Sequence, residues 1–123
     1  MTENQISKII LDCAFKVHTA LGPGLVEKVY QECLAYEIIK EGLKVEVEKP
    51  MPLIYEEIKF DCGYRIDLWV ERKVVVELKV VEAFNDVHIA QTLTYMRLSE
   101  SKLGLLLNFY TKSLKNGIKR LIL

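Results

Sequence analysis

Three charged residues, Asp67, Glu77 and Lys79, lie in segments whose other residues are largely apolar. The stretch 65–79 reads RIDLWVERKVVVELK, and its β-branched and apolar residues predict two buried strands. Buried strands rarely contain a charged side chain that has neither a partner nor a chemical role. Two acids and one lysine in such strands are therefore candidates for a functional site.

The spacing of these residues indicates that they can meet on one face of a sheet. Glu77 and Lys79 are two residues apart, so both side chains point to the same face of a strand. Asp67 precedes a turn near residues 71–73, and directly opposite residues of an antiparallel pair share a face. Asp67 lies opposite Glu77 if this turn has an odd number of residues, as 71–73 does, or if a bulge intervenes.

Two carboxylates and one ammonium group on one patch could form a metal site. Adjacent carboxylates repel each other, and this repulsion raises the pKa of one of them. A divalent cation removes the conflict, and Mg²⁺ prefers carboxylate oxygens as ligands. A lysine beside the cation can hold or deprotonate a water, or stabilise charge on a phosphorane. The alternative is a structural ion pair between Lys79 and one acid, which the short pattern alone favours.

The elements around these residues follow from hydrophobic periodicity and from turn residues. Residues 3–21 and about 25–40 have helical spacing, Thr2 and Gln5 can form a capping box, and GPG at 22–24 ends the first helix. A third helix begins at Asn85 or Asp86 and runs to about Ser99. The predicted strands are 43–49, 53–60, 62–70, 73–81 and 103–109, with a short edge strand within 116–123.

The expected order is therefore α-α-β-β-β-β-α-β, with one more strand possible at the end. This order predicts a mixed central sheet flanked by helices, of the α/β or α+β class. The chain has 123 residues, of which 50% are apolar and 28% charged. Such a composition is typical of a globular protein, and we expect a single domain over residues 1–123.

The sequence also predicts where the protein works. No apolar run approaches the roughly 20 residues of a membrane-spanning helix, and the amino terminus lacks the pattern of a signal peptide. We therefore expect a cytoplasmic protein without a membrane partner. Cys13, Cys33 and Cys62 form no CxxC pair, so we interpret them as reduced, buried residues rather than zinc ligands.

The charges are unevenly distributed although the formal net charge is zero. Residues 101–123 carry five Lys or Arg and no acid, whereas the other 12 cations and all 17 acids lie in residues 1–100. A basic tail could face nucleic acid. A solvated, lysine-rich surface explains five charges equally well.

The order of motifs resembles that of the PD-(D/E)XK nuclease superfamily. Asp67 followed by Glu77-Leu78-Lys79, between one helix and another, matches its defining pattern. The resemblance implies that Asp67 and Glu77 ligate Mg²⁺ or Mn²⁺, that the backbone carbonyl of Leu78 completes the site, and that Lys79 is the catalytic lysine. Ile66 stands where the superfamily name has Pro, which provides no ligand.

More narrowly, GLVEKVY at 24–30 is similar to the pattern that names the GxxExxY proteins, with Gly24, Glu27 and Tyr30 in place. The similarity continues through VHTALGPG, YRIDLWVERKVVVELK, AQTLTYMRL and GLLLNFY. It implies that Glu27 is a further metal ligand and that Tyr30, three residues later on the same side of a helix, helps to position substrate. The alternative is a core aromatic at Tyr30 and a solvated helix charge at Glu27.

Gln91 and Tyr95 resemble the QxxxY element of exonuclease-like branches of the superfamily, which implies that they position the substrate. With His88 they fall on one side of a helix. A partly buried Tyr and a surface Gln are the alternative. His18 matches the VH that precedes LGPG, and we expect a structural role for it, with a contact near the active site as the alternative.

The resemblance implies a Mg²⁺-dependent nuclease that hydrolyses phosphodiester bonds of nucleic acid, with DNA favoured over RNA and a role in DNA repair or processing. The main alternative is a nuclease-fold nucleic-acid-binding or accessory module that works through a protein partner without catalysis of its own. The short chain and zero net charge fit this alternative. A hydrolase of small phosphorylated molecules is a third possibility. A homodimer is also possible, through the last strand or the first helix.

Overall fold

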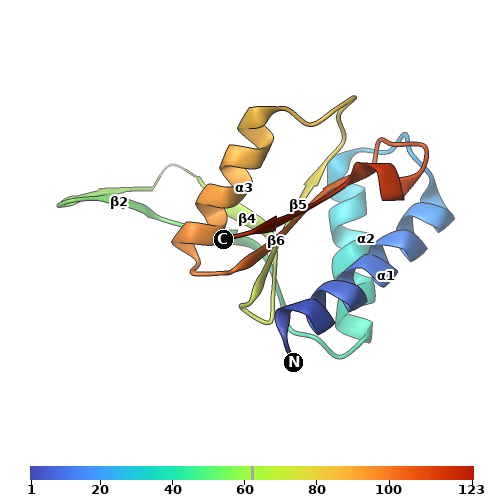
Figure 1. The fold of residues 1–123 in the computed structure, drawn as a ribbon, viewed down its shortest axis with the longest axis horizontal. Helices are drawn as coiled ribbons and strands as arrows, with labels where there is room; N and C mark the ends of the chain where they lie inside the picture. Colours follow the sequence, from blue (N-terminus) through green and yellow to red (C-terminus); the bar gives the residue numbers. More distant parts are fainter. Residues whose placement is uncertain (62) are drawn as a thin grey trace.

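The computed structural model describes residues 1–61 and 63–123, and it places a five-stranded mixed sheet between two helical layers (Figure 1). Helices α1 and α2 cover one face of the sheet and α3 covers the other. The elements are α1 (Glu3–Leu21), α2 (Glu27–Lys40), β1 (Val45–Pro50), β2 (Leu53–Tyr55), β3 (Ile58–Phe60), β4 (Arg65–Val70), β5 (Val74–Lys79), α3 (Asp86–Leu98), β6 (Leu103–Asn108), the 3-10 turn η1 (Leu114–Gly117) and β7 (Ile118–Ile122).

The first helix has the bounds that its sequence predicts. Thr2 caps it, because its side chain accepts a hydrogen bond from the Gln5 N–H at 3.2 Å while the Gln5 side chain accepts one from the Thr2 N–H at 2.9 Å. The helix ends at Gly22, whose φ of 68° suits a residue without a Cβ. The buried stripe of α1 recurs at helical spacing and includes Ile6, Ile10 and Val17.

The sheet has the strand order β1-β4-β5-β6-β7. β5 and β6 are parallel and are joined through α3, whereas the other neighbouring strands are antiparallel. Parallel pairing requires such a crossover connection. β5 lies at the centre, and its first five residues are buried, as a strand covered on both faces requires. The predicted mixed sheet flanked by helices is confirmed, and so is the edge strand, β7.

Alternate residues of β5 face different cores. Val74, Val76 and Leu78 pack with α1 and α2 in the larger core, whereas Val75 packs with the smaller core beneath α3. Glu77 and Lys79 therefore belong to the α3 face by the alternation of strand side chains.

No helix within residues 1–61 or 63–123 is long and apolar enough to cross a membrane.

The prediction of one strand over residues 53–60 was wrong. β2 and β3 are two three-residue strands that pair with each other as a separate sheet, with Leu53 opposite Phe60. Glu56 and Glu57 form the turn, and Glu56 has a φ of 51°. The hairpin projects from the body of the molecule (Figure 1). Strand propensity favours one continuous strand here, because β-branched and aromatic residues lie on both sides of Glu56 and Glu57.

The cysteine prediction holds in part. Cys13 is buried and Cys33 half-buried, and both are free thiols. Burial raises the pKa of Cys13 to about 11, so this thiol stays protonated and unreactive. Cys62 lies outside the described residues.

Candidate functional site

The register of β4 and β5 places Asp67 beside Glu77. A three-residue turn at 71–73 joins the strands, and Leu68 lies opposite Val76. Asp67 and Glu77 are the next residues beyond this last pair, and the Asp67 N–H bonds to the Glu77 side chain. The odd-length turn thus produces the arrangement that the sequence predicts.

β4 bends at Asp67. Ile66 packs with the core beneath α3, whereas Leu68 packs with the core beneath α1 and α2. Residues i and i+2 of a regular strand share a face, so the backbone must turn between these two. The neighbouring strand is also irregular there, because Glu48 has a φ of 51° and its position interrupts the β1–β4 pairing. Distortions of this kind redirect a side chain, here that of Asp67.

Asp67 and Glu77 are held together by reciprocal hydrogen bonds. The Asp67 N–H donates to Glu77 Oε2 at 2.7 Å, and the Leu78 N–H donates to Asp67 Oδ2 at 2.9 Å. Bonds from an N–H to an ionised carboxylate are among the stronger hydrogen bonds in proteins. Each carboxylate therefore has one oxygen fixed by the backbone of the opposite strand.

The backbone of Leu78 faces the Asp67–Glu77 pair, although the Leu78 side chain is buried beneath α1 and α2. The N–H and C=O of one strand residue point to the same edge, and the edge alternates along the strand. The Lys79 carbonyl accepts a hydrogen bond from Phe109 N–H at 3.0 Å, on the β6 side. The Leu78 carbonyl is consequently directed to the β4 side, where Asp67 lies.

Burial gives the two acids unusual electrostatics. Glu77 is only 3% exposed, and burial, followed by the charge of Asp67, raises its pKa well above the usual value. Burial also raises the pKa of Asp67, against the opposing effects of the Leu78 N–H and the charge of Lys79. Adjacent acids that are buried or half-buried resist ionisation together.

Glu27, the first residue of α2, belongs to the same electrostatic neighbourhood. Its side chain is half-buried, and burial, followed by the charge of Asp67, raises its pKa, while Lys79 lowers it. Glu27 also raises the pKa of Glu77. Glu27 is therefore not the fully solvated helix charge of the alternative.

Tyr30 lies in the core rather than among the carboxylates. It is fully buried and stacks on Phe109, with 4.7 Å between the ring centroids. Its hydroxyl donates to the Gly22 carbonyl and accepts from the Leu25 N–H at 3.1 Å. Tyr30 therefore fixes the loop that leads into α2, and so the start of the helix that carries Glu27.

Lys79 is joined to α3 through Gln91. Its Nζ donates to Gln91 Oε1 at 3.3 Å, and Gln91 Nε2 lies 3.5 Å from Tyr95 Oη, a distance at the limit for a hydrogen bond. Within residues 1–61 and 63–123, no carboxylate oxygen lies within 4.0 Å of Lys79 Nζ. The structure therefore does not contain the structural ion pair that the short pattern alone would favour.

Tyr95 is buried, whereas Gln91 beside it is half-buried rather than a surface residue. Burial, followed by the charge of Glu77, raises the pKa of Tyr95, so the phenol stays protonated and can donate a hydrogen bond. Gln91 and Tyr95 thus lie on the side of α3 that faces Lys79, over the same face of the sheet as Glu77.

The two histidines have structural contacts. His18 is buried, and its Nε2 lies 2.8 Å from the Thr111 carbonyl, which ties the end of α1 to the loop after β6. His88 completes the cap of α3, because its N–H donates to Asn85 Oδ1 and its Nδ1 accepts from the Asn85 N–H. The structural role expected for His18 agrees with this placement.

Sequence reasoning missed Asn108. This buried residue ends β6 directly beside Lys79. Its side chain accepts from the Val81 N–H at 3.2 Å, accepts from the Tyr110 N–H at 3.1 Å, and donates to the Val81 carbonyl at 2.7 Å. It therefore fixes the chain that follows Lys79. The available signal was one polar residue at the end of an otherwise apolar strand, LGLLLNF.

The donors at this site fit a hard divalent cation. The adjacent carboxylates of half-buried Asp67 and buried Glu77, together with one backbone carbonyl, supply oxygen ligands of the kind that Mg²⁺ prefers. For the described part of the chain, no group of three or more His, Cys, Asp and Glu side chains is arranged to hold an ion. Asp67 and Glu77 are thus the carboxylates already in place, and Glu27 is a nearby carboxylate outside this pair.

Comparisons with known proteins agree with this geometry. A family model of the PD-(D/E)XK nuclease superfamily matches residues 4–121, which is nearly the whole chain. No curated protein and no solved structure matches. The superfamily implies nucleic-acid binding and nuclease activity, and its nucleases generally use divalent metal ions. The chain belongs to the PD-(D/E)XK nuclease superfamily.

Proposed function

We propose that this protein is a nuclease of the GxxExxY type that uses Mg²⁺ or Mn²⁺ to hydrolyse phosphodiester bonds of nucleic acid. The observation that carries the proposal is the adjacent pair of carboxylates, half-buried Asp67 and buried Glu77, with Lys79 beside them and bonded to Gln91. A structural role for Lys79 would place it in an ion pair. We further propose that residues 1–123 form one nuclease-like domain.

Asp67, Glu77 and the Leu78 carbonyl would hold the cation, with Glu27 as an additional carboxylate. When bound, the cation would polarise the phosphate and lower the pKa of an attacking water. The hydrogen bonds from Asp67 N–H and Leu78 N–H keep the two carboxylates oriented before the cation arrives. Such preorganisation removes a reorganisation cost from the reaction.

Lys79 would orient the attacking water and stabilise negative charge on the phosphorane. Gln91 accepts one of its hydrogen bonds and so limits where the ammonium group can lie. Tyr95, kept protonated by its raised pKa, can donate to a phosphate oxygen. In this proposal Tyr30 acts through Glu27, by fixing the start of α2, and does not contact substrate.

The second candidate is a nucleic-acid-binding or accessory module that works through a protein partner. The zero net charge favours it, because autonomous nucleic-acid binding relies on contacts between cations and phosphates. The exposed apolar residues of the β2–β3 hairpin, which include Ile54, Tyr55 and Ile58, also suit a protein contact.

Cleavage assays distinguish these functions. Labelled single- and double-stranded DNA and RNA are incubated with wild type, Glu77→Gln and Lys79→Ala, in Mg²⁺, Mn²⁺ or a chelator. The proposal predicts metal-dependent cleavage by wild type and its loss in both variants. Glu46→Gln is the matched control, because it makes the same chemical change on β1. Nucleic-acid binding without cleavage and without a metal requirement would establish the binding module instead.

A further inference from the structure

A pocket lies between α3 and the segment that returns from the β2–β3 hairpin. Its volume is about 300 Å³. Leu53 and Tyr64 line it from the hairpin side, and Val87, Gln91 and Tyr95 are among its α3 residues. Tyr64 is 44% exposed, so its ring is accessible at the mouth of the pocket.

This pocket adjoins the candidate catalytic residues. Gln91 and Tyr95 belong to its wall, and the same Gln91 accepts the hydrogen bond from Lys79. Tyr64 also lies near enough to Tyr95 to raise its pKa. A molecule in the pocket would therefore touch Gln91, which is bonded to the candidate catalytic lysine, Lys79. By contrast, a groove of about 310 Å³ between α1 and α2 contains Lys16, Glu32 and Glu37 and no candidate site residue.

The lining suits a flat heterocycle with a polar edge. Most of its residues are apolar, none is an acid, and the amide of Gln91 can both donate and accept hydrogen bonds. An accessible tyrosine ring offers a stacking surface, and proteins bind unpaired bases by stacking them on aromatic rings and by bonding to their edges. Arg97, which is exposed, donates to Oγ1 of the lining residue Thr94 at 3.2 Å, so a cation is bonded to the pocket wall and is accessible to a phosphate.

We propose that this pocket binds one unpaired nucleobase of the substrate, and that the enzyme therefore acts on single-stranded or unpaired nucleic acid. A base stacked and paired inside a duplex cannot enter such a pocket unless it is extruded, which requires unpairing and unstacking. This inference rests on the proposed nuclease function and specifies its substrate. It assigns the stacking contact to Tyr64 and the edge contact to Gln91.

The test measures binding separately from cleavage. The Glu77→Gln protein, which leaves substrate intact, is titrated into single-stranded DNA and RNA that contain 2-aminopurine, whose fluorescence reports stacking. The same bases in a full duplex are measured in parallel. Tyr64→Ala and Tyr64→Phe are added to this background, with Tyr36→Ala as control, because Tyr36 is 63% exposed on α2 and lies outside the pocket. Ala90→Leu fills the pocket from an exposed position of α3.

We expect tighter binding of single strands than of duplex. Tyr64→Ala should weaken single-strand binding roughly ten-fold or more, the usual effect of losing one base–aromatic stack. Tyr64→Phe should retain the affinity, Ala90→Leu should reduce it, and Tyr36→Ala should not change it. The relative response of DNA and RNA identifies which of them supplies the base.

Several results would overturn the pocket assignment. The first is equal binding of duplex and single strand, and the second is an equal effect of Tyr64→Ala and Tyr36→Ala on binding. The third is a change from dimer to monomer in Tyr64→Ala, because that result would assign the pocket to a second copy of the chain. The cleavage assay keeps the two proposals distinct. If wild type cleaves and Tyr64→Ala cleaves equally well with the same strand preference, the nuclease stands and the pocket assignment fails. If wild type cleaves nothing, the nuclease fails, and the 2-aminopurine titration still decides the pocket.

Discussion

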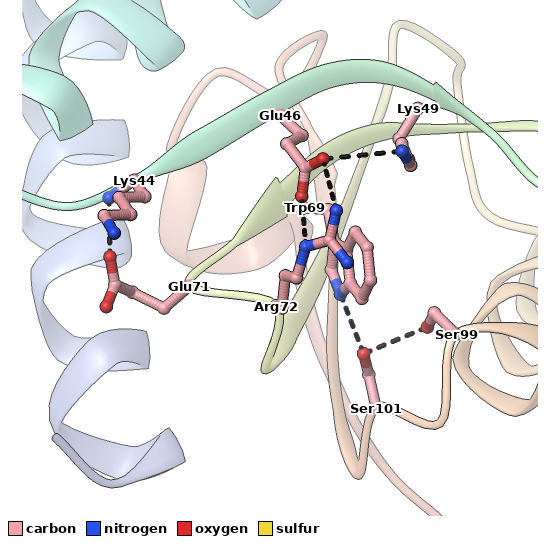
Figure 2. A network of polar contacts seen from close by, with 8 residues as sticks. All are labelled: Lys44, Glu46, Lys49, Trp69, Glu71, Arg72, Ser99 and Ser101. Carbon is pink, nitrogen blue, oxygen red and sulfur yellow. Dashed lines mark hydrogen bonds and ion pairs between the residues drawn. The ribbon is translucent and has the colours of Figure 1, made fainter.

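The two ends of the β4–β5 pair both carry charged residues, but their charges are satisfied in different ways. At the turn end, Arg72 donates two hydrogen bonds to Glu46, at 2.9 and 3.0 Å, and its guanidinium lies 4.8 Å from the centre of the Trp69 ring (Figure 2). Lys49 adds a second cation to Glu46 at 3.5 Å. Opposite charges are therefore paired within the fold.

At the open end, Asp67 and Glu77 are adjacent, and N–H groups rather than a cation bind them. The pKa values of the two ends differ accordingly. The pKa of Glu46 is lowered, first by its hydrogen bond with Arg72, whereas that of Glu77 is raised, first by burial and then by Asp67. The ion pairs at the turn end explain why its charges are stable there, whereas the charges at the open end lack such pairs among the described residues and are assigned to a bound cation in the proposed function.

The largest expected difference between the two ends is in catalysis. Glu77→Gln removes a proposed metal ligand, so metal-dependent cleavage should fall by roughly 100-fold or more, the usual scale for losing a group that stabilises the transition state. Glu46→Gln should leave cleavage within about two-fold, because Glu46 pairs with the surface cations Arg72 and Lys49 and has no proposed role in the site. Single-turnover cleavage rates measure both. An equal loss of cleavage rate in Glu77→Gln and Glu46→Gln would mean that the two ends do not differ in their role in catalysis.

At the turn end, a substitution should change stability without changing cleavage. Ser101 is buried, and its Oγ accepts the hydrogen bond from Trp69 Nε1 at 3.0 Å (Figure 2). Ser101→Ala leaves this indole N–H without its acceptor, which should lower the free energy of unfolding by about 1–3 kcal/mol. Urea unfolding measures the change. The cleavage rate of the folded variant should stay at the wild-type value, and a loss of cleavage would mean that the two ends are coupled.

The pH dependence of stability should have opposite signs at the two ends. The folded pKa of Glu77 is raised, so the native state holds this proton more tightly than the unfolded state does. In a chelator, its contribution to the free energy of unfolding is fully present below the unfolded pKa. The unfolded pKa is about 4.3. As pH rises from that value through the folded pKa, the contribution of Glu77 to the free energy of unfolding is lost. Glu46, whose folded pKa is lowered, contributes stability above its unfolded pKa and loses it as pH falls through the folded pKa.

Urea unfolding between pH 4 and 8 measures this difference. Relative to wild type, Glu77→Gln should gain stability, on the order of 1 kcal/mol, as pH rises above 5, because it removes an unfavourable ionisation. Glu46→Gln should show no such gain. The same pH profile for wild type and Glu77→Gln would mean that Glu77 is not electrostatically strained.

The smallest expected effect is that of the exposed ion pair itself. Arg72 and Glu46 have side-chain exposures of 64% and 36%. Glu46→Gln should therefore cost only about 0.2–1 kcal/mol, and the cost should shrink as salt is added. Thermal unfolding at low and high ionic strength checks this. A larger, salt-independent loss would indicate that Glu46 is more than a surface partner.

The sequence predicts much of the frame that holds the site. The capping box at Thr2 and Gln5, the odd-length turn at 71–73 and the apolar strand that ends in Glu77 and Lys79 are local patterns, and the structure contains them. Such features depend on neighbouring residues, so periodicity and turn chemistry reveal them.

Contacts between distant segments could not be predicted in this way. Tyr30 faces the core rather than the site because its hydroxyl binds the Gly22–Leu25 loop, and Asn108 fixes the chain after Lys79 through bonds to Val81. Both depend on how elements pack, which spacing alone does not specify. The bend of β4 at Asp67 likewise depends on the tertiary arrangement.

Calorimetric titration of Mg²⁺ and Mn²⁺ into wild type and Glu77→Gln tests the central claim most directly, that Asp67 and Glu77 meet over a divalent cation. Titration of Glu46→Gln provides the matched control at the turn end. We predict saturable binding at millimolar metal or below in wild type and in Glu46→Gln, and its loss in Glu77→Gln. No binding at millimolar metal in wild type, or equal binding in all three proteins, would contradict the account.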